Sequence, residues 1–224
     1  MARIRILSQL QDALDSEMSW RIKEIADFRL VIKRQPSSAQ TFVRAGIALI
    51  YAHWEGFIKS ASEVYLEFVE SQGLAYRELK TCFGVLGLKS QLALLGDSRK
   101  SVRNVETLNF VLTHIDKPAR MRISSAIDTE SNLTSAVFSN IAASLDISYV
   151  RYETKFKLID ESLVKRRNSV AHGEYLDIDS GEFMSLAQDV LQLMREYKTD
   201  IENAASLHSY RRQPLQAAKA PATI

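Results

Sequence analysis

Apolar residues recur at spacings of three and four along most of this chain, which is the pattern of amphipathic helices. Residues 4–34 contain no glycine or proline and carry one such stripe, and Pro36 then ends the predicted helix. A second stripe follows from about residue 42 to residue 68 and leads to Gly73, a residue type that often ends helices. The first stripe consists of Leu7, Leu10, Leu14, Met18, Ile22, Ile25 and Phe28.

The connection between these two predicted helices is short. Ser37 and Gln40 have the spacing of a capping box, which would begin the second helix. Two long helices joined by a short turn predict an antiparallel hairpin. Residues 51–57 read Tyr-Ala-His-Trp-Glu-Gly-Phe, with aromatic side chains on several helix faces. We therefore assign Tyr51 and Trp54 to the core rather than to a platform that stacks nucleobases.

The middle of the chain predicts less regular structure. Residues 74–130 contain short apolar runs that are interrupted by glycines and by Pro118, and they predict an irregular helical insert. Ser131 or Asn132 is placed to cap a helix that continues to Leu145.

Two further helices follow. One extends from about residue 150 to residue 172, where Gly173 is placed to end it. The other begins at Asp179 or Ser180 and carries an apolar stripe on one face.

Length and composition indicate one globular domain. A chain of 224 residues is long enough for one full core, and 46% hydrophobic and 25% charged residues are ordinary values for a folded protein. Periodicity ends near residue 207, so we predict a single domain over residues 1–207 and a flexible tail over 208–224. Eight glycines and four prolines are few for many short strands, so we predict an all-α bundle with long antiparallel helices and a helical insert.

Net charge and cysteine content limit the kinds of binding site and the cellular location that the sequence allows. A net charge of +2 gives no strong field, so binding of nucleic acid requires a local patch. Cys82 is the only cysteine, which excludes an intramolecular disulfide and a cysteine-based zinc site. Arg3, Arg5 and Gln9 interrupt the N-terminal apolar stretch, so we expect no signal peptide, no membrane span and a cytoplasmic location.

The segment 163–174 carries the candidate chemistry. Asn168 and His172 are four residues apart and share a helix face, and Arg167 has a side chain long enough to reach the same place. A guanidinium offers paired donors to a phosphate, and an imidazole exchanges protons with a 2′-hydroxyl or a leaving 5′-oxygen. If the target is an RNA phosphodiester, these residues together could support in-line cleavage without a metal ion, with stabilisation of the transition-state charge as the large contribution.

The same residues resemble a known family. Arg167 and His172 match the Arg-x4-6-His motif of the HEPN superfamily, and a polar residue directly after the arginine, here Asn168, is typical of it. Three segments resemble a bacterial HEPN branch associated with toxin and antiphage loci: Ala-His-Trp-Glu-Gly-Phe-Ile-Lys at 52–59, Glu-Ser-Asn-Leu at 130–133 and Arg-Asn-Ser-Val-Ala-His-Gly-Glu at 167–174.

This resemblance implies a helical bundle that forms a homodimer, with two motifs facing each other across a composite cleft. It implies a metal-independent endoribonuclease with no cofactor, in which Arg167 grips the scissile phosphate, His172 acts as acid or base, and Asn168 orients them. RNA is then the ligand, and an antitoxin or a co-encoded defence protein is a possible partner. The alternative is a non-catalytic HEPN module that binds RNA or nucleotides, or that serves for dimerisation.

Other interpretations of these residues remain open. Arg167 and His172 are also suited to complement the dipole at a helix C-terminus. Lys165 and Arg166 form either a solvated face or an extension of the phosphate-binding patch. Tyr175 lies three positions after the histidine, whereas some HEPN toxins have a modified tyrosine two positions after it, so we assign Tyr175 to packing or to a loop.

Overall fold

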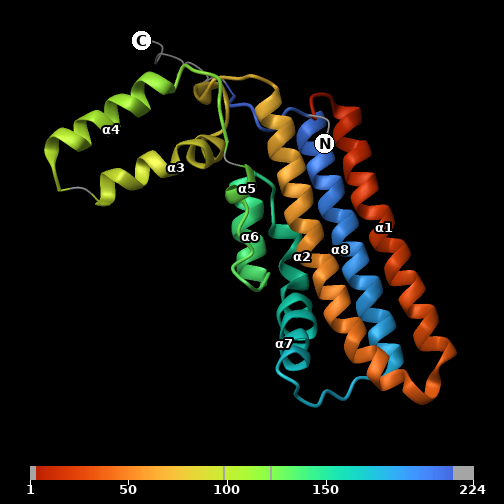
Figure 1. The fold of residues 1–224 in the computed structure, drawn as a ribbon. Coiled ribbons are helices and arrows are strands. Elements are labelled where there is room, and N and C mark those ends of the chain that lie inside the picture. The colour runs from red at the N-terminus through yellow and green to blue at the C-terminus, as the bar shows by residue number, and fades with distance from the viewer. Residues whose placement is uncertain (1–3, 98, 122, 214–224) are drawn as a thin grey trace, which may run out of the picture.

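Three long helices form the body of the protein. The computed structural model describes residues 4–97, 99–121 and 123–213. Within them, α1 (Leu7–Arg34), α2 (Ala39–Ser71) and α8 (Ser180–Ser206) lie side by side, and each contacts the other two (Figure 1). Every named element of the described residues is a helix, which confirms the all-α prediction. No helix in these ranges is both long and apolar enough to cross a membrane.

The predicted hairpin of α1 and α2 is confirmed, but its turn differs from the prediction. The short helix η1 (Pro36–Ser38) joins the two helices, and Ser38 precedes α2 without a side-chain hydrogen bond. The Gln40 amide instead donates to the Leu176 carbonyl at 2.7 Å. The capping box is therefore wrong, because Gln40 is used in a contact with a distant loop.

An aromatic cluster occupies the core between α2, α6 (Ser135–Ser144) and α8. Trp54 is fully buried, with its ring centroid 5.4 Å from that of Phe138, and Tyr197 of α8 packs against the same phenylalanine at 5.6 Å. The assignment of Trp54 and Tyr51 to the core is confirmed, since Tyr51 is only 4% exposed.

Gly46 marks a close approach between α2 and its neighbours. A methyl group at this position would lie 2.5 Å from Phe183 Cε2 and 2.7 Å from Phe28 Cε1. We expect Gly46→Ala to lower the free energy of unfolding by about 1–3 kcal/mol, because two packed rings would have to move. Gly84→Ala is the control, since nothing lies within 4 Å of its added methyl. Chemical denaturation measures both, and equal stability of Gly46→Ala and the unmutated protein would contradict this packing.

The predicted insert is helical but more regular than expected. Two helices, α3 (Thr81–Asp97) and α4 (Ser101–His114), form an arm that projects from one end of the bundle (Figure 1). Helix α3 continues through all three of its glycines. A glycine within a helix costs only about 1 kcal/mol, so packing overrides it. The short helix α5 (Ile123–Ala126) then leads towards α6.

The loop before α6 does not cap the helix as predicted. Thr134 is the N-cap, and its hydroxyl accepts a hydrogen bond from Val137 N at 3.3 Å. Ser131 and Asn132 lie upstream of the cap, where Ser131 has a φ of +66°. The Ser131 carbonyl and the Asn132 side chain are therefore available for other contacts, whereas the Asn132 carbonyl accepts from Thr134 N at 2.8 Å.

The predicted helix over residues 150–172 is helical but not one α-helix. It consists of a 3-10 segment, η3 (Val150–Lys155), a π-helix, η4 (Leu158–Lys165), and α7 (Arg166–Ala171). Gly173 has a φ of +74° and ends it as predicted, because only glycine adopts this conformation without strain. The Asp179 carboxylate accepts from Glu182 N at 2.8 Å, which confirms the predicted start of α8.

The packed domain extends beyond residue 207. Tyr210 is fully buried with its ring centroid 6.0 Å from that of Phe68, and its carbonyl accepts from Lys80 N at 2.9 Å. Arg212 N donates to the Glu78 carbonyl at 2.8 Å. The predicted boundary at residue 207 is therefore too early, because the domain includes residues 208–212. Residues 214–224 of the predicted tail lie outside the described residues.

Candidate functional site

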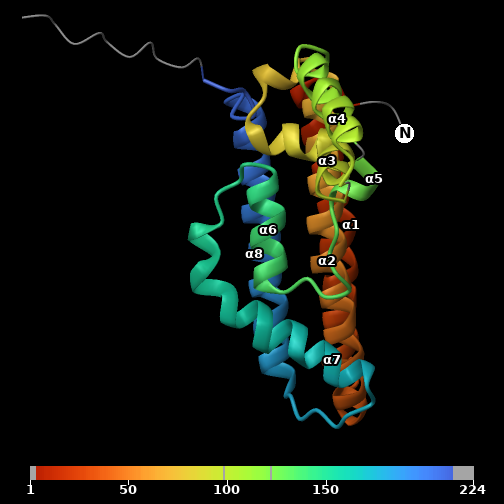
Figure 2. The same ribbon diagram turned by 90° about the vertical axis from the view of Figure 1, so that its left-hand side faces the viewer.

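The candidate site lies at the end of the bundle opposite the arm. Helix α7 packs on α2 there, and the loop over residues 172–179 connects it to α8 (Figure 2). Two side chains of the hairpin hold this loop: Arg44 Nη2 donates to the Glu174 carbonyl at 2.9 Å, and Gln40 donates to Leu176. The loop that follows His172 is therefore fixed to the start of α2.

Arg167 is held by two other parts of the chain. Its Nη2 donates to Asn132 Oδ1 at 2.6 Å and to the Ser131 carbonyl at 3.1 Å. Its Cζ lies 3.9 Å from the ring centroid of Tyr51 on α2, which is a cation–π contact. We call Tyr51, Ser131 and Asn132 the Arg167 clamp. The clamp fixes the position of a guanidinium that is only half-buried.

The loop that supplies the clamp is itself anchored to α2. Leu133 N donates to Tyr51 Oη at 2.8 Å, and Thr129 Oγ1 donates to Glu55 Oε1 at 2.6 Å. Glu130 and Ser131 both have positive φ, at 50° and 66°. Two consecutive non-glycine residues in this region store strain, which persists only where the surroundings hold it. The strained backbone thus brings two acceptors to Arg167.

The clamp limits how Arg167 can bind a phosphate. A guanidinium has five N–H donors, and each of its two paired edges includes one from Nη2. Both Nη2 donors are engaged by the clamp, and Nε is buried without a hydrogen-bond partner in the described structure. Only Nη1 therefore remains for a ligand in this conformation. The paired-donor grip expected from the sequence requires the clamp to open.

Asn168 and His172 lie one helical turn apart, as predicted. His172 N donates to the Asn168 carbonyl at 2.9 Å, and the His172 side chain is exposed at the C-cap of α7. In the part of the chain that the structure describes, neither side chain forms a hydrogen bond with the other or with Arg167. An orienting role for Asn168 therefore stays a prediction.

Lys165 and Arg166 are each close to a carboxylate. Lys165 Nζ lies 3.0 Å from Glu161 and is 72% exposed, and Arg166 Nη2 lies 3.8 Å from Glu182. These contacts fit the solvated face that we considered, although a phosphate could compete for both cations. Their role in binding substrate stays a prediction.

The residues of the clamp were not predicted from the sequence to be part of the site. Tyr51 was assigned to the core alone, and Ser131 and Asn132 were assigned to a helix cap. Burial raises the pKa of Tyr51, so its hydroxyl stays neutral at physiological pH. The resemblance of residues 52–59 and 130–133 to HEPN proteins points to the neighbourhood of these residues, but it does not indicate that the two segments meet.

His53 and Gly56, on either side of Trp54, belong to the contact between α1 and α2 and not to the clamp. His53 is buried, and its Nε2 lies 3.0 Å from Glu24 of α1; burial lowers its pKa. Gly56 leaves space for the buried Arg21, because a methyl there would lie 3.2 Å from Arg21 Nη2. These residues join α1 to α2, whereas Tyr51 and Glu55 hold the clamp loop.

Helix α7, which carries Arg167 and Asn168 and ends at His172, packs on α2, the longest helix of the described residues. The chain belongs to the RiboL-PSP-HEPN family, whose model matches residues 16–203. The match includes Arg167, Asn168, His172 and the whole clamp. No curated protein and no solved structure matches the chain. Membership of a HEPN family supports RNA cleavage or RNA binding as the class of function.

Proposed function

We propose that this protein is a metal-independent endoribonuclease of toxin or antiphage-defence type, with its site at the interface of a homodimer. The observation that carries this proposal is the clamped guanidinium of Arg167 on the same short helix as the exposed imidazole of His172. A fixed cation for the phosphate and a titratable group for the protons are the two requirements for cleavage of RNA by its own 2′-hydroxyl.

The chemistry needs two proton transfers. The 2′-oxygen attacks phosphorus and loses its proton to a base, while the bond to the 5′-oxygen breaks and that oxygen receives a proton from an acid. The products are a 2′,3′-cyclic phosphate and a 5′-hydroxyl. One imidazole cannot act as base and acid in the same step, so a second copy of the chain would supply the other. Arg167 Nη1 would stabilise the charge on the phosphate.

The clamp has a positioning role in this proposal. We expect Asn132→Ala to lower kcat about tenfold with little change in KM, because the guanidinium loses its closest hydrogen bond. Asn132→Asp keeps the acceptor, so it should restore much of kcat while raising KM, since the carboxylate offsets the charge of Arg167. Steady-state kinetics on a labelled RNA measure both. Asn140→Ala, on the exposed side of α6, is the matched control, and wild-type kcat in Asn132→Ala would contradict the positioning role.

Cleavage of labelled RNA by the purified protein in EDTA tests the function, and light scattering tests the dimer. We expect cleavage in the chelator by a protein of twice the mass of the chain. A fully active monomer would overturn the composite site. RNA binding without cleavage would instead favour the non-catalytic module, an alternative supported by the engagement of both Nη2 donors of Arg167 in the clamp.

A toxin must be restrained in its host. We therefore propose an antitoxin or a co-encoded defence protein as a partner, on the basis of the HEPN resemblance. The test is to express this protein together with each neighbouring gene and to measure cell growth. Recovery of growth with one of these genes would support the proposed partner. Toxicity that none of them reduces would contradict it.

A further inference from the structure

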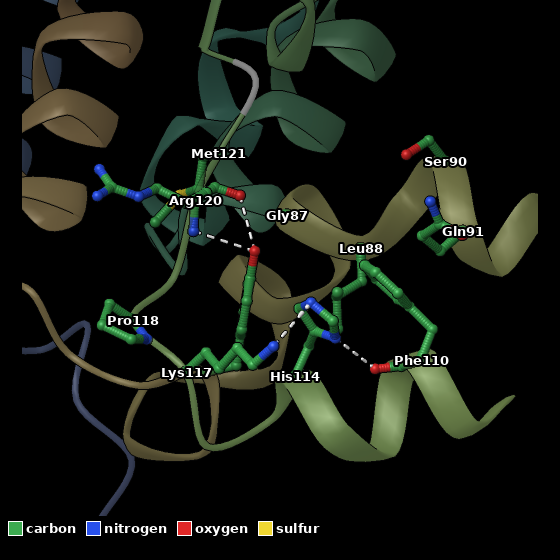
Figure 3. A pocket seen from close by; sticks show the side chains of 11 residues that line it. Gly87, Leu88, Ser90, Gln91, Phe110, His114, Lys117, Pro118, Arg120 and Met121 are labelled. Atoms are coloured by element: carbon green, nitrogen blue, oxygen red, sulfur yellow. Dashed lines mark hydrogen bonds between the residues drawn. The ribbon is translucent and has the colours of Figure 1, made fainter. Parts of the chain in front are cut away.

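A pocket of about 460 Å³ lies at the base of the arm, far from Arg167 and His172. Helices α3 and α4 and the segment over residues 117–121 form its walls (Figure 3). Its volume lies in the range of pockets that bind small molecules. Nothing in the proposed cleavage site uses these residues.

One wall of the pocket is a stack of two aromatic rings. The rings of Phe110 and His114 have centroids 3.7 Å apart and planes within 20° of each other. His114 Nδ1 lies 2.8 Å from the Phe110 carbonyl, and Lys117 Nζ lies 3.3 Å from His114 Nε2. A lysine only donates, so these contacts fit the tautomer in which Nδ1 carries the proton. The imidazole is thus held flat against Phe110, as Figure 3 shows.

The floor of the pocket is rigid. Tyr76 Oη donates to the Arg120 carbonyl at 2.8 Å and accepts from Arg120 N at 3.0 Å. Gly87 of α3 allows this arrangement, because a methyl there would lie 2.6 Å from Tyr76 Oη and 2.8 Å from the Arg120 carbonyl. The chain segment that carries Lys117 and Arg120 is therefore fixed over α3.

The part of the chain that forms this pocket is net basic, and two of its cations line the pocket. Residues 80–120 contain seven lysines and arginines but three aspartates and glutamates, in a chain whose net charge is only +2. Lys117 and Arg120 line the pocket, and Arg120 Nη1 lies 3.4 Å from Glu70 while its side chain is 72% exposed. Residues 80–120 are therefore a local basic region of the kind that nucleic-acid binding requires, and the rest of the chain is net acidic.

We propose that this pocket binds one unpaired nucleotide of the RNA substrate. The base stacks on the Phe110–His114 pair, and the neighbouring phosphate contacts Lys117 and Arg120. Stacking suits any base, since every base has a π-face, and the two cations select for an anion beside it. This inference rests on the proposed function for the identity of the ligand. A duplex would not fit, because its bases are not free to stack on a protein side chain.

The position of the pocket predicts its kinetic role. The arm and α7 lie at opposite ends of the bundle (Figures 1 and 2), and α2 between them spans about 50 Å at 1.5 Å per residue. A nucleotide held there does not touch the reacting phosphate in the same protomer. The pocket should therefore contribute to affinity for RNA, so that its loss raises KM and leaves kcat nearly unchanged.

Fluorescence anisotropy of a short labelled single-stranded RNA tests this, with His172→Ala as the background that prevents cleavage. We expect Phe110→Ala to raise Kd about tenfold, and Lys117→Ala to weaken binding and reduce its salt dependence by about one counterion. Phe110→Leu keeps the apolar volume without the ring and should bind as weakly as Phe110→Ala. Leu112→Ala is the matched control, since Leu112 is 58% exposed on the same helix and does not line the pocket.

Two outcomes would overturn the proposal. One is a Kd for the labelled RNA that is unchanged in Phe110→Ala, provided that circular dichroism shows this variant to be as helical as the parent protein. The other is competition by AMP as effective as competition by the RNA, which would make the pocket a site for free nucleotides. Cleavage in EDTA by the wild-type protein is measured separately, so rejection of the nucleotide pocket would not bear on the proposed ribonuclease activity. Conversely, RNA binding that depends on Phe110 in a protein without cleavage activity would support the pocket and reject the proposed enzyme.

Discussion

Replacement of His172 by alanine is expected to lower the rate constant of RNA cleavage by about a hundredfold to ten-thousandfold, the usual contribution of a general acid or base. In a composite site the loss should lie at the upper end, because both copies of the imidazole disappear. His172 is exposed at the end of α7, so the substitution should leave stability nearly unchanged. Single-turnover cleavage of a labelled RNA measures the rate constant.

Tyr175→Ala is the control for this variant. Tyr175 lies on the same loop and is 78% exposed, and we assign it no catalytic role. The Tyr175→Ala protein should therefore cleave RNA at the wild-type rate. If His172→Ala also cleaved at the wild-type rate, the imidazole would have no part in the reaction, and the activity would belong to another site or to a contaminant.

Replacement of Arg167 by alanine should cause a loss of both activity and stability. Cleavage should fall about a hundredfold to a thousandfold, as for removal of one donor that stabilises the charge of a transition state. The free energy of unfolding should fall by about 1–3 kcal/mol, because Asn132 and Ser131 lose their donor and the Tyr51 ring loses its cation. Arg167→Lys keeps the charge but not the geometry, so it should recover little of either.

Arg166→Ala separates this effect from a general loss of positive charge. Its Nη2 lies 3.8 Å from Glu182, so its removal should change cleavage by only a few-fold. Denaturation curves recorded on the same samples show whether Arg167→Ala is folded at the assay temperature. A folded Arg167→Ala with wild-type cleavage would contradict the role of the guanidinium.

The long helices could be predicted because their signals are local. The stripe from Leu7 to Phe28 and the caps at Gly173 and Asp179 depend only on neighbouring residues, and the structure confirms them. The errors arose where distant contacts prevailed. Gln40 contacts Leu176 rather than the start of its own helix, and Tyr210 packs against Phe68, 142 positions earlier in the sequence. Local patterns do not report such contacts.

The candidate site could be predicted only as far as it lies on one helix. Asn168 and His172 were placed one turn apart from their spacing, and the structure agrees. The clamp could not be predicted, since Tyr51 lies on α2 and Asn132 in a loop of positive φ, and only the folded chain brings them to Arg167. The paired grip on phosphate expected from the sequence took no account of the acceptors that engage Nη2, and it stays a prediction that requires the clamp to open.

The clamp joins three separated segments of the chain. The segment with Tyr51 and Glu55 anchors the loop, the segment with Asn132 supplies the acceptor, and the segment with Arg167 supplies the cation. A change in any one of them would displace the guanidinium. The position of the guanidinium therefore depends on all three segments.

The chemistry of the RNA ends tests the proposed ribonuclease most directly. Purified protein would be incubated with RNA in EDTA, beside His172→Ala, and the product ends would be determined by mass spectrometry. Attack by the 2′-hydroxyl predicts a 2′,3′-cyclic phosphate and a 5′-hydroxyl, formed in the chelator by the wild-type protein and absent with His172→Ala. Products with a 3′-hydroxyl and a 5′-phosphate, or cleavage that requires added Mg²⁺, would contradict a metal-independent site built on Arg167 and His172.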